Sequence, residues 1–217
     1  MKILAVGMVE ELANIHEQIS KQTIQPDVID LYIDEDPAVG INNRRNRIAD
    51  NMLLLREKVI ASDADLIWQV EGDGVFEDNT LERLLGHYFR GKDGDVYSGV
   101  EVGRHGLYCI GAWHINDNGT EIQSVDYQLE GIQKVDAMGL YCFLTSRRTW
   151  LKGYADWEDE VWGPDVNFFL STSADKYVDM GIQIGHKVKN GIIRVTDEST
   201  CNAKYWLENG KWEFKQL

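Results

Sequence analysis

The stretch Asp65-Leu66-Ile67-Trp68-Gln69-Val70-Glu71-Gly72-Asp73 decides the fold that this sequence predicts. Its apolar run from Leu66 to Val70 has the length and the β-branched and aromatic content of a buried strand. The run stops at two carboxylates separated by Gly72, which lets the backbone turn and a ligand approach closely. Carboxylate oxygens bind Mg²⁺ and Mn²⁺ alongside phosphate oxygens. We therefore predict a strand end that holds a divalent metal and a diphosphate, with a solvated turn as the alternative.

A β-α-β unit precedes this strand at the start of the chain. Apolar periodicity predicts a strand over residues 2–7, a helix over 10–22 and a second strand over 28–33. Such a unit makes its strands parallel, and open sheets of this kind bind ligands at the carboxyl ends of their strands. Gly7, Asp34 and Asp36 are therefore expected at that edge, where an acidic side chain can accept hydrogen bonds from a nucleobase or a ribose hydroxyl. The alternative role of these acids is to solvate a loop.

Arginines crowd the first turn of the helix that the pattern predicts after Gly40. They are Arg44, Arg45 and Arg47. Cations at a helix N-terminus oppose the helix macrodipole, so this cluster is unfavourable unless an anion lies against it. Because a helix start is itself an anion site, the cluster indicates a phosphate group near Arg44 and Arg45. Ion pairs with surface acids are the alternative.

The second half of the chain changes from crossovers to hairpins. The pattern predicts a helix from Asn79, with Asn79 or Asp78 as its cap. Strands are predicted over 95–102 and 107–115, followed by a tight turn at 117–119 and a central strand over 135–144. A helix with Pro164 in its first turn and a strand over 182–188 follow. Gly139 is expected at a close approach. The late strand carries His186 between Gly185 and Lys187. These elements predict an α/β fold.

Composition and charge limit the class of protein. The chain has 217 residues, 43% of them hydrophobic, which suits one domain over residues 1–217. Its net charge of −14 repels nucleic-acid phosphates and anionic membrane surfaces. The apolar run over residues 1–7 is too short for a signal peptide or a membrane span, so we expect a cytoplasmic protein. Cys109, Cys142 and Cys201 lack disulfide or zinc spacing and are expected as buried thiols.

The order of these features resembles the nucleotide-sugar-dependent glycosyltransferases of the GT-A fold, especially the large inverting family 2. The matching landmarks are the acidic strand end at 33–36, the Arg-Asn helix start at 45–49, the acid-Gly-acid motif at 71–73, the Val-Asp-small-Gly strand at 135–139, the helix start at 163–168 and the histidine in 185–188. The resemblance implies a single GT-A domain over residues 1–217. Such a domain has a Rossmann-like nucleotide-binding half with a mixed, mainly parallel central sheet, and antiparallel hairpins on the acceptor side.

The resemblance also implies an activity and its residues. A sugar would pass from a nucleoside diphosphate donor, most commonly a UDP-sugar, to a hydroxyl of a saccharide or small molecule. Mn²⁺ or Mg²⁺ would be the cofactor, bound by Asp73, Glu71 and His186. Asp165 would be the general base of an inverting reaction. The implied donor contacts are Gly7 and Glu71, Asp34 on the base, and Asp36 with Arg44 or Arg45 near the ribose and diphosphate.

Two positions depart from the family pattern. Glu71 replaces an Asp and has a longer arm, so direct metal coordination is favoured for Asp73 over Glu71. Pro164 replaces the Glu that precedes the base, which can remove an acceptor contact.

Trp157 and Trp162 lie among acids near the implied acceptor side, where such rings either stack on a sugar or pack within the fold.

Several alternatives stay open from the sequence. A nucleotidyltransferase can share this architecture and metal, but it needs a Gly-rich basic loop after the first strand, and residues 7–11 are acidic there. A non-catalytic sugar- or nucleotide-binding module would keep the fold without turnover. GT-A folds also support a retaining outcome if Asp165 points elsewhere. A modified DNA base as acceptor requires basic side chains on one face, namely Arg44, Arg45, Arg47, Arg104, Arg147 and Arg148.

Overall fold

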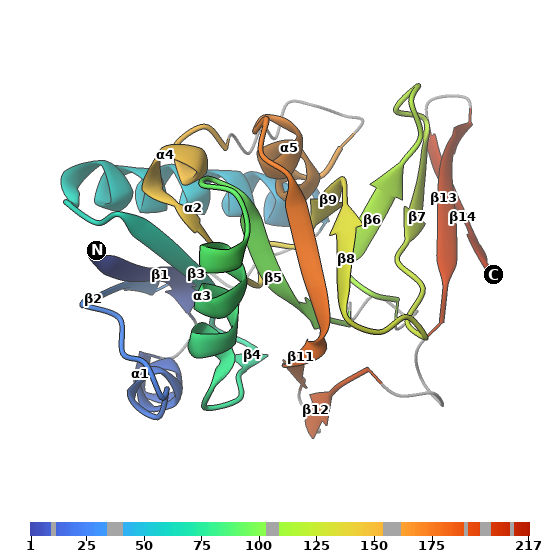
Figure 1. Cartoon of the computed structure of the whole chain (residues 1–217). Helices are drawn as coiled ribbons and strands as arrows, with labels where there is room; N and C mark the ends of the chain where they lie inside the picture. The colour runs from blue at the N-terminus through green and yellow to red at the C-terminus, as the bar shows by residue number, and fades with distance from the viewer. Residues whose placement is uncertain are drawn as a thin grey trace.

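A mixed central sheet and a second, antiparallel sheet form the framework of the protein (Figure 1). The structure is a computed structural model that describes residues 1–9, 12–33, 41–102, 109–153, 162–188, 191–195, 201–208 and 211–217. None of the described helices is long and apolar enough to cross a lipid bilayer.

The central sheet has the strand order β12-β11-β5-β10-β3-β1-β2, and β4 and β8 both pair with β11. Its strands are β1 (Ile3–Val9), β2 (Val28–Ile33), β3 (Leu66–Glu71), β4 (Gly74–Val75), β5 (Val96–Glu101), β8 (Ile132–Val135), β10 (Cys142–Ser146), β11 (Lys176–Val188) and β12 (Gly191–Ile193). β1 is parallel to β2 and β3, and β5 is parallel to β11. Because β10 is antiparallel to both β3 and β5, these five parallel strands end at one edge. The predicted β-α-β unit is confirmed.

The second sheet has the strand order β14-β13-β7-β6-β9, and its paired strands are antiparallel. Its strands are β6 (Ala112–Ile115), β7 (Glu121–Ser124), β9 (Ala137–Met138), β13 (Ala203–Glu208) and β14 (Lys211–Gln216). The predicted tight turn joins β6 to β7, where Gly119 has a φ of +65° and its N–H donates to the Asn116 carbonyl at 2.9 Å. A glycine suits this left-handed conformation because it carries no Cβ.

Helices cover both faces of the central sheet (Figure 1). They are α1 (Leu12–Ser20), α2 (Ile41–Ala61), α3 (Thr80–Arg90), α4 (Arg147–Trp150) and α5 (Pro164–Leu170). One core receives Leu55 of α2, Trp150 of α4 and Phe169 of α5, whereas the other receives Ile15 of α1 and Leu84 of α3. Successive residues of β1 serve the two cores in turn, because neighbouring side chains of a strand point to opposite faces.

β3 lies between β1 and β10, as expected for the strand that organises the sequence. Ile67 and Trp68 are fully buried in opposite cores, which explains why this strand is apolar without alternation. Gln69 is also buried, and its Oε1 accepts a hydrogen bond from Trp150 Nε1 at 2.9 Å. Its Nε2 donates to the Leu140 carbonyl at 3.1 Å. These bonds satisfy a polar side chain inside the core and fasten α4 to β3.

The predicted single strand over residues 135–144 is wrong. Residues 137–138 form β9 in the second sheet, whereas β10 begins at Cys142 in the central sheet. The chain changes sheets at Gly139, whose N–H donates to the Gly111 carbonyl at 2.7 Å. A Cβ on Gly139 would lie 2.6 Å from Tyr141 Cδ1, so the expected close approach is confirmed. Both halves of the run are buried, and a continuous apolar pattern therefore conceals the bend.

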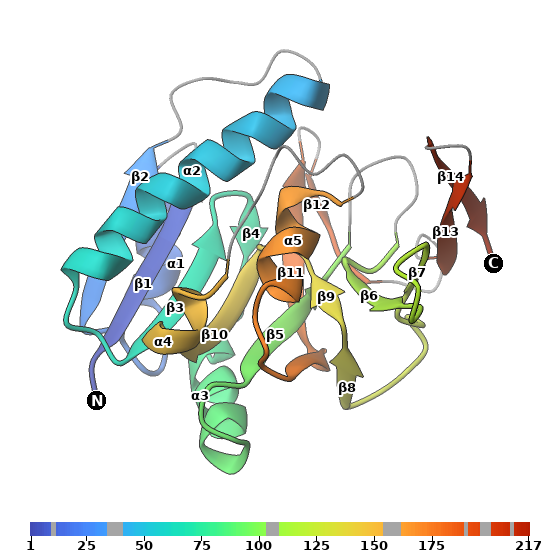
Figure 2. The ribbon, with the colours of Figure 1, turned by 90° about the horizontal axis from the view of Figure 1, so that it is seen from above.

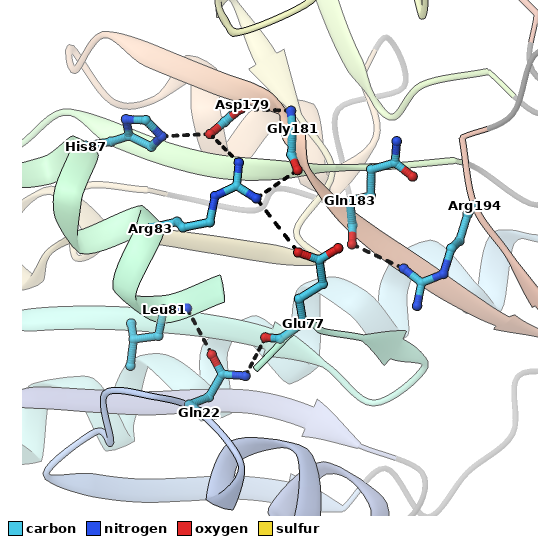
Figure 3. A network of polar contacts seen from close by, with 9 residues as sticks. All are labelled: Gln22, Glu77, Leu81, Arg83, His87, Asp179, Gly181, Gln183 and Arg194. Carbon is cyan, nitrogen blue, oxygen red and sulfur yellow. Dashed lines mark hydrogen bonds and ion pairs between the residues drawn. The ribbon is translucent and has the colours of Figure 1, made fainter. Parts of the chain in front are cut away.

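The N-terminus of α3 is capped by a residue from another part of the chain (Figure 3). Gln22 Oε1 accepts a hydrogen bond from Leu81 N at 3.0 Å, and Gln22 Nε2 donates to the Glu77 carbonyl at 2.8 Å. Asn79, one of the two predicted caps, occupies the N-cap position as predicted, but its side chain makes no cap hydrogen bond. A long-range amide thus replaces the local cap.

The opposite side of α3 is tied to β11 (Figure 3). Arg83 Nη2 and His87 Nε2 contact Asp179 Oδ2 at 3.3 and 2.7 Å. Asp179 lies where the pairing of β11 with β5 shifts register, between Val178 and Gln183. These contacts therefore hold α3 against the irregular part of β11, whose continuation carries His186.

Candidate metal centre

A turn after β3 brings Asp73 to β11. The N–H of Gly72 donates to a carbonyl of β1 at 2.9 Å, and the chain then enters β4, where Gly74 pairs with His186. The carbonyl of Asp73 accepts a hydrogen bond from Lys187 N at 2.7 Å. Backbone pairing therefore sets Asp73 beside His186, although 113 positions separate them in the sequence.

His186 is buried on β11 with both ring nitrogens close to oxygen atoms. Nδ1 lies 3.0 Å from the carbonyl oxygen of Val102, a group that can only accept. A neutral imidazole that donates from Nδ1 presents a lone pair at Nε2, and Nε2 lies 3.2 Å from Asp73 Oδ2. Two lone pairs at this distance need a cation or a proton between them. The contact therefore fits either a bound metal or an imidazolium.

Glu101 supplies a second carboxylate from the end of β5. It is 5% exposed, and its Oε1 lies 3.8 Å from His186 Nδ1. Burial, and then the nearby negative charge of Glu101, raise the pKa of Tyr141 above its usual value. Glu101 was not among the residues predicted from the sequence. Like β3, the strand that carries it ends in an acidic residue, but its position at the same sheet edge follows only from the length and parallel direction of β5.

Asp73, Glu101 and His186, here called the acid–histidine trio, can hold a metal ion. Each offers one ligand atom, and these atoms lie within 4.8 Å of one another. Two carboxylate oxygens with one imidazole nitrogen form a donor set that suits Mn²⁺ or Zn²⁺, whereas Mg²⁺ favours oxygen ligands. The residues present therefore fit a divalent cation. Glu71 was predicted as a ligand with Asp73 and His186; among the described residues the group whose ligand atoms lie this close contains Glu101 and not Glu71.

Glu101→Gln is expected to change stability and metal affinity in opposite directions. A buried carboxylate and a partly buried one repel each other without a cation, so the variant should raise the free energy of unfolding of the metal-free protein by about 1 kcal/mol at pH 8. It should also weaken Mn²⁺ binding about tenfold. Urea unfolding in chelator and calorimetric titration measure the two quantities. A loss of stability with unchanged affinity would instead make Glu101 a structural partner of His186.

Comparison with known proteins places the fold. No protein-family model matches this chain, and no curated protein matches it. A solved structure, "Crystal Structure of A197 from STIV", matches with a TM-score of 0.57 and 14% sequence identity, over 91% of this chain and 95% of that chain. The chain shares its fold with A197 from STIV. At this identity the likeness concerns the fold alone.

The predicted donor-binding residues fall into three groups. Asp34 and Asp36 lie outside the described residues, as does the predicted acceptor residue Trp157. Arg44 and Arg45 lie in the first turn of α2, where the structure describes the backbone but not these side chains. Gly7 and Glu71 lie in the last part of β1 and at the end of β3. A Cβ on Gly7 would meet the Val70 carbonyl oxygen at 2.0 Å, so close strand packing accounts for this glycine.

Asp165 lies in the first turn of α5, as predicted, with Pro164 at the first helical position. Figure 2 shows α5 beginning on the side of the central sheet toward which β1 and β3 point. The carboxylate folds back over the helix start, where Oδ1 accepts from Val166 N at 2.9 Å. A Cβ on Gly163 would lie 2.7 Å from this oxygen, so the glycine leaves room for the carboxylate. Asp165 is not a member of the acid–histidine trio.

Trp162 is half-buried and packs against the core that α5 covers. A Cβ on Gly119 would lie 3.6 Å from its ring, which places Trp162 beside the turn between β6 and β7. The packing alternative thus accounts for much of this side chain.

Arg47 and Arg147 lie toward opposite ends of α2, and Arg104 lies outside the described residues. Arg147 Nε and Nη2 donate to the carbonyls of Val59 and Ile60 at 2.9 and 2.8 Å, which caps the C-terminus of α2. Arg47 lies near the other end of the same helix, roughly 18 Å away at 1.5 Å per residue. Arg148 is exposed and follows Arg147 on α4. This separation weakens the case for a DNA acceptor.

Proposed function

We propose that this protein is a metal-dependent glycosyltransferase of the GT-A type, which moves a sugar from a nucleoside diphosphate donor to a hydroxyl acceptor. The observation that carries the proposal is the acid–histidine trio. It joins the acid-Gly-acid turn after β3 to His186 of β11, at the edge where the parallel strands end. Ligands of open α/β sheets bind at this edge. The match to A197 from STIV supports the α/β fold alone.

The chemistry needs charge stabilisation and a base. A cation held by Asp73, Glu101 and His186 would neutralise negative charge that develops on the leaving diphosphate. Asp165 accepts the proton of the acceptor hydroxyl while the hydroxyl oxygen bonds to the anomeric carbon and the bond from that carbon to the diphosphate oxygen breaks. Attack from the face opposite the leaving group inverts the sugar. Glu71 and the arginines at the start of α2 are the proposed donor contacts.

Calorimetric titration with UDP, GDP, CDP and ADP, each with and without Mn²⁺, tests the proposal. We expect one diphosphate to bind in the presence of Mn²⁺ and to lose its binding in chelator, with UDP as the first candidate. Binding without transfer or hydrolysis of any sugar nucleotide would favour a non-catalytic module. If no diphosphate binds under either condition, the proposed function is wrong, whatever metal the trio holds.

Asp165→Asn is expected to lower the rate of sugar transfer about 10² to 10⁴-fold, because an amide cannot take up the acceptor proton. Donor binding should stay within about twofold of the parent protein, since the proposal gives Asp165 no donor contact. Asp78→Asn, at an exposed acid before α3, is the matched control for loss of one surface charge. Equal losses of transfer and donor binding would assign Asp165 to the structure of the helix start.

A further inference from the structure

Two cysteines far apart in the sequence meet in the structure. Cys109 and Cys201 are 92 positions apart, yet their Sγ atoms lie 3.0 Å from each other. Both are free thiols with exposures of 5% and 9%, and they form a small cluster with Ala203 and Tyr205 of β13. The sequence prediction of buried thiols is confirmed, but the spacing of the cysteines gave no sign of this contact. Two thiols in contact can be joined by thiol–disulfide exchange, whereas an isolated buried thiol has no partner for this reaction.

The two thiols lie on segments that hold different parts of the fold. Cys109 comes directly before Ile110, which forms a β-bridge with Val102. Val102 is the residue whose carbonyl orients His186. Cys201 comes two residues before β13, which pairs with β7 and β14 at the outer side of the second sheet. A covalent bond between the thiols would therefore fasten β13 and β14 to the segment beside the acid–histidine trio.

We propose that Cys109 and Cys201 form an intrachain disulfide by exchange with a low-molecular-weight disulfide such as oxidised glutathione. One protein thiolate attacks a sulfur of oxidised glutathione and releases one reduced glutathione, which leaves a mixed disulfide on the protein. The second protein thiol then loses its proton and attacks the sulfur of the first protein cysteine, so the bond from that sulfur to glutathione breaks and the second reduced glutathione leaves with the proton. The protein loses two hydrogen atoms, and the two electrons reduce the glutathione disulfide. This inference is independent of the proposed glycosyltransferase function.

The surroundings of the pair set the rate of this exchange. Burial, followed by the contact with Cys201, raises the pKa of Cys109 to about 12. The thiolate is the attacking species, so little of Cys109 is reactive at neutral pH. We therefore expect slow formation of the disulfide, with a rate that rises about tenfold per pH unit between pH 7 and pH 9 where Cys109 is the attacking thiol.

Mass spectrometry of the intact protein after incubation with oxidised glutathione at pH 8.5 tests the inference. We expect a mass loss of about 2 Da, reversed by dithiothreitol, and a proteolytic fragment that links Cys109 to Cys201. The oxidised protein should unfold about 10 °C higher than the reduced protein, because the bond closes a long loop in the unfolded chain. Calorimetric scans of the two forms measure that shift.

Variants separate this pair from the remaining cysteine. Cys109→Ser and Cys201→Ser should each abolish the mass loss and the thermal shift, whereas Cys142→Ala should retain both, because Cys142 is fully buried at the start of β10 and is not part of the pair. Alkylation of the parent protein in denaturant gives a readout that does not depend on whether a variant folds. After oxidation we expect only Cys142 to be alkylated. Alkylation of all three cysteines, or stable glutathione adducts without the cross-link, would overturn the inference.

Discussion

Replacement of Asp73 by Asn is expected to weaken Mn²⁺ binding about 100-fold, or roughly 2.8 kcal/mol. The variant keeps the size of the side chain but removes the negative charge that faces His186 Nε2 at 3.2 Å. It leaves the backbone contact with Lys187 N intact, because that bond uses the Asp73 carbonyl. The fold should therefore survive, and metal-dependent donor binding should be lost with the metal.

Calorimetric titration of Mn²⁺ into the parent protein and the variant measures this effect. Glu71→Gln is the matched control, because Glu71 lies two positions away at the end of β3 but is not part of the acid–histidine trio. Its effect on Mn²⁺ affinity should stay below about threefold. A large loss in Glu71→Gln beside the loss in Asp73→Asn would restore the ligand set predicted from the sequence, whereas little change in Asp73→Asn would contradict both ligand sets.

Gly7→Ala is expected to lower the free energy of unfolding by about 3 kcal/mol. Gly7 is paired with Val70 in the parallel register of β1 and β3, at the centre of the sheet. The added Cβ would lie 2.0 Å from the Val70 carbonyl oxygen, a backbone atom that cannot rotate away. The two strands must separate to accept the methyl group, which disturbs hydrogen bonds and both cores.

Urea unfolding followed by circular dichroism measures this loss. Gly86→Ala is the matched control, because Gly86 lies within α3 and its added Cβ would meet only the Arg90 guanidinium, at 3.5 Å. That variant should be stabilised by about 0.5 to 1 kcal/mol through the higher helix propensity of alanine. If Gly7→Ala keeps parental stability but loses donor binding, the sequence-based role of Gly7 at the donor site is favoured over close packing.

The sequence was sufficient to predict those helices and strands that show a clear local periodicity. The apolar run of β3 and the β-α-β unit before it were predicted because strand and helix periods are visible within a few residues. The common edge of β1, β2 and β3 followed from the handedness of crossovers. Asp73 and His186 were predicted to meet only through the resemblance to GT-A enzymes, since no local pattern links residues 113 positions apart.

Other features depend on contacts that no short window of sequence contains. Glu101 joins the acid–histidine trio because β5 lies beside β11 in the sheet. The periodicity of the sequence does not predict the order of strands across a sheet. Asn79 occupies the N-cap position of α3 as the local rule predicts, but Gln22, which follows α1, accepts the hydrogen bond from Leu81 N, and no local rule indicates that contact. The contact between Cys109 and Cys201 likewise arises from the packing of the second sheet against the β5–β6 connection.

Pulsed electron paramagnetic resonance of bound Mn²⁺ tests the metal centre most directly. We expect the electron spin of bound Mn²⁺ to show hyperfine coupling to one imidazole nitrogen in the parent protein, because His186 is the nitrogen ligand of the trio. The coupling should vanish in His186→Ala, which identifies the ring among the five histidines of the chain. Bound Mn²⁺ without nitrogen coupling, or coupling that persists in His186→Ala, would contradict the assignment of Asp73, Glu101 and His186 as a metal site.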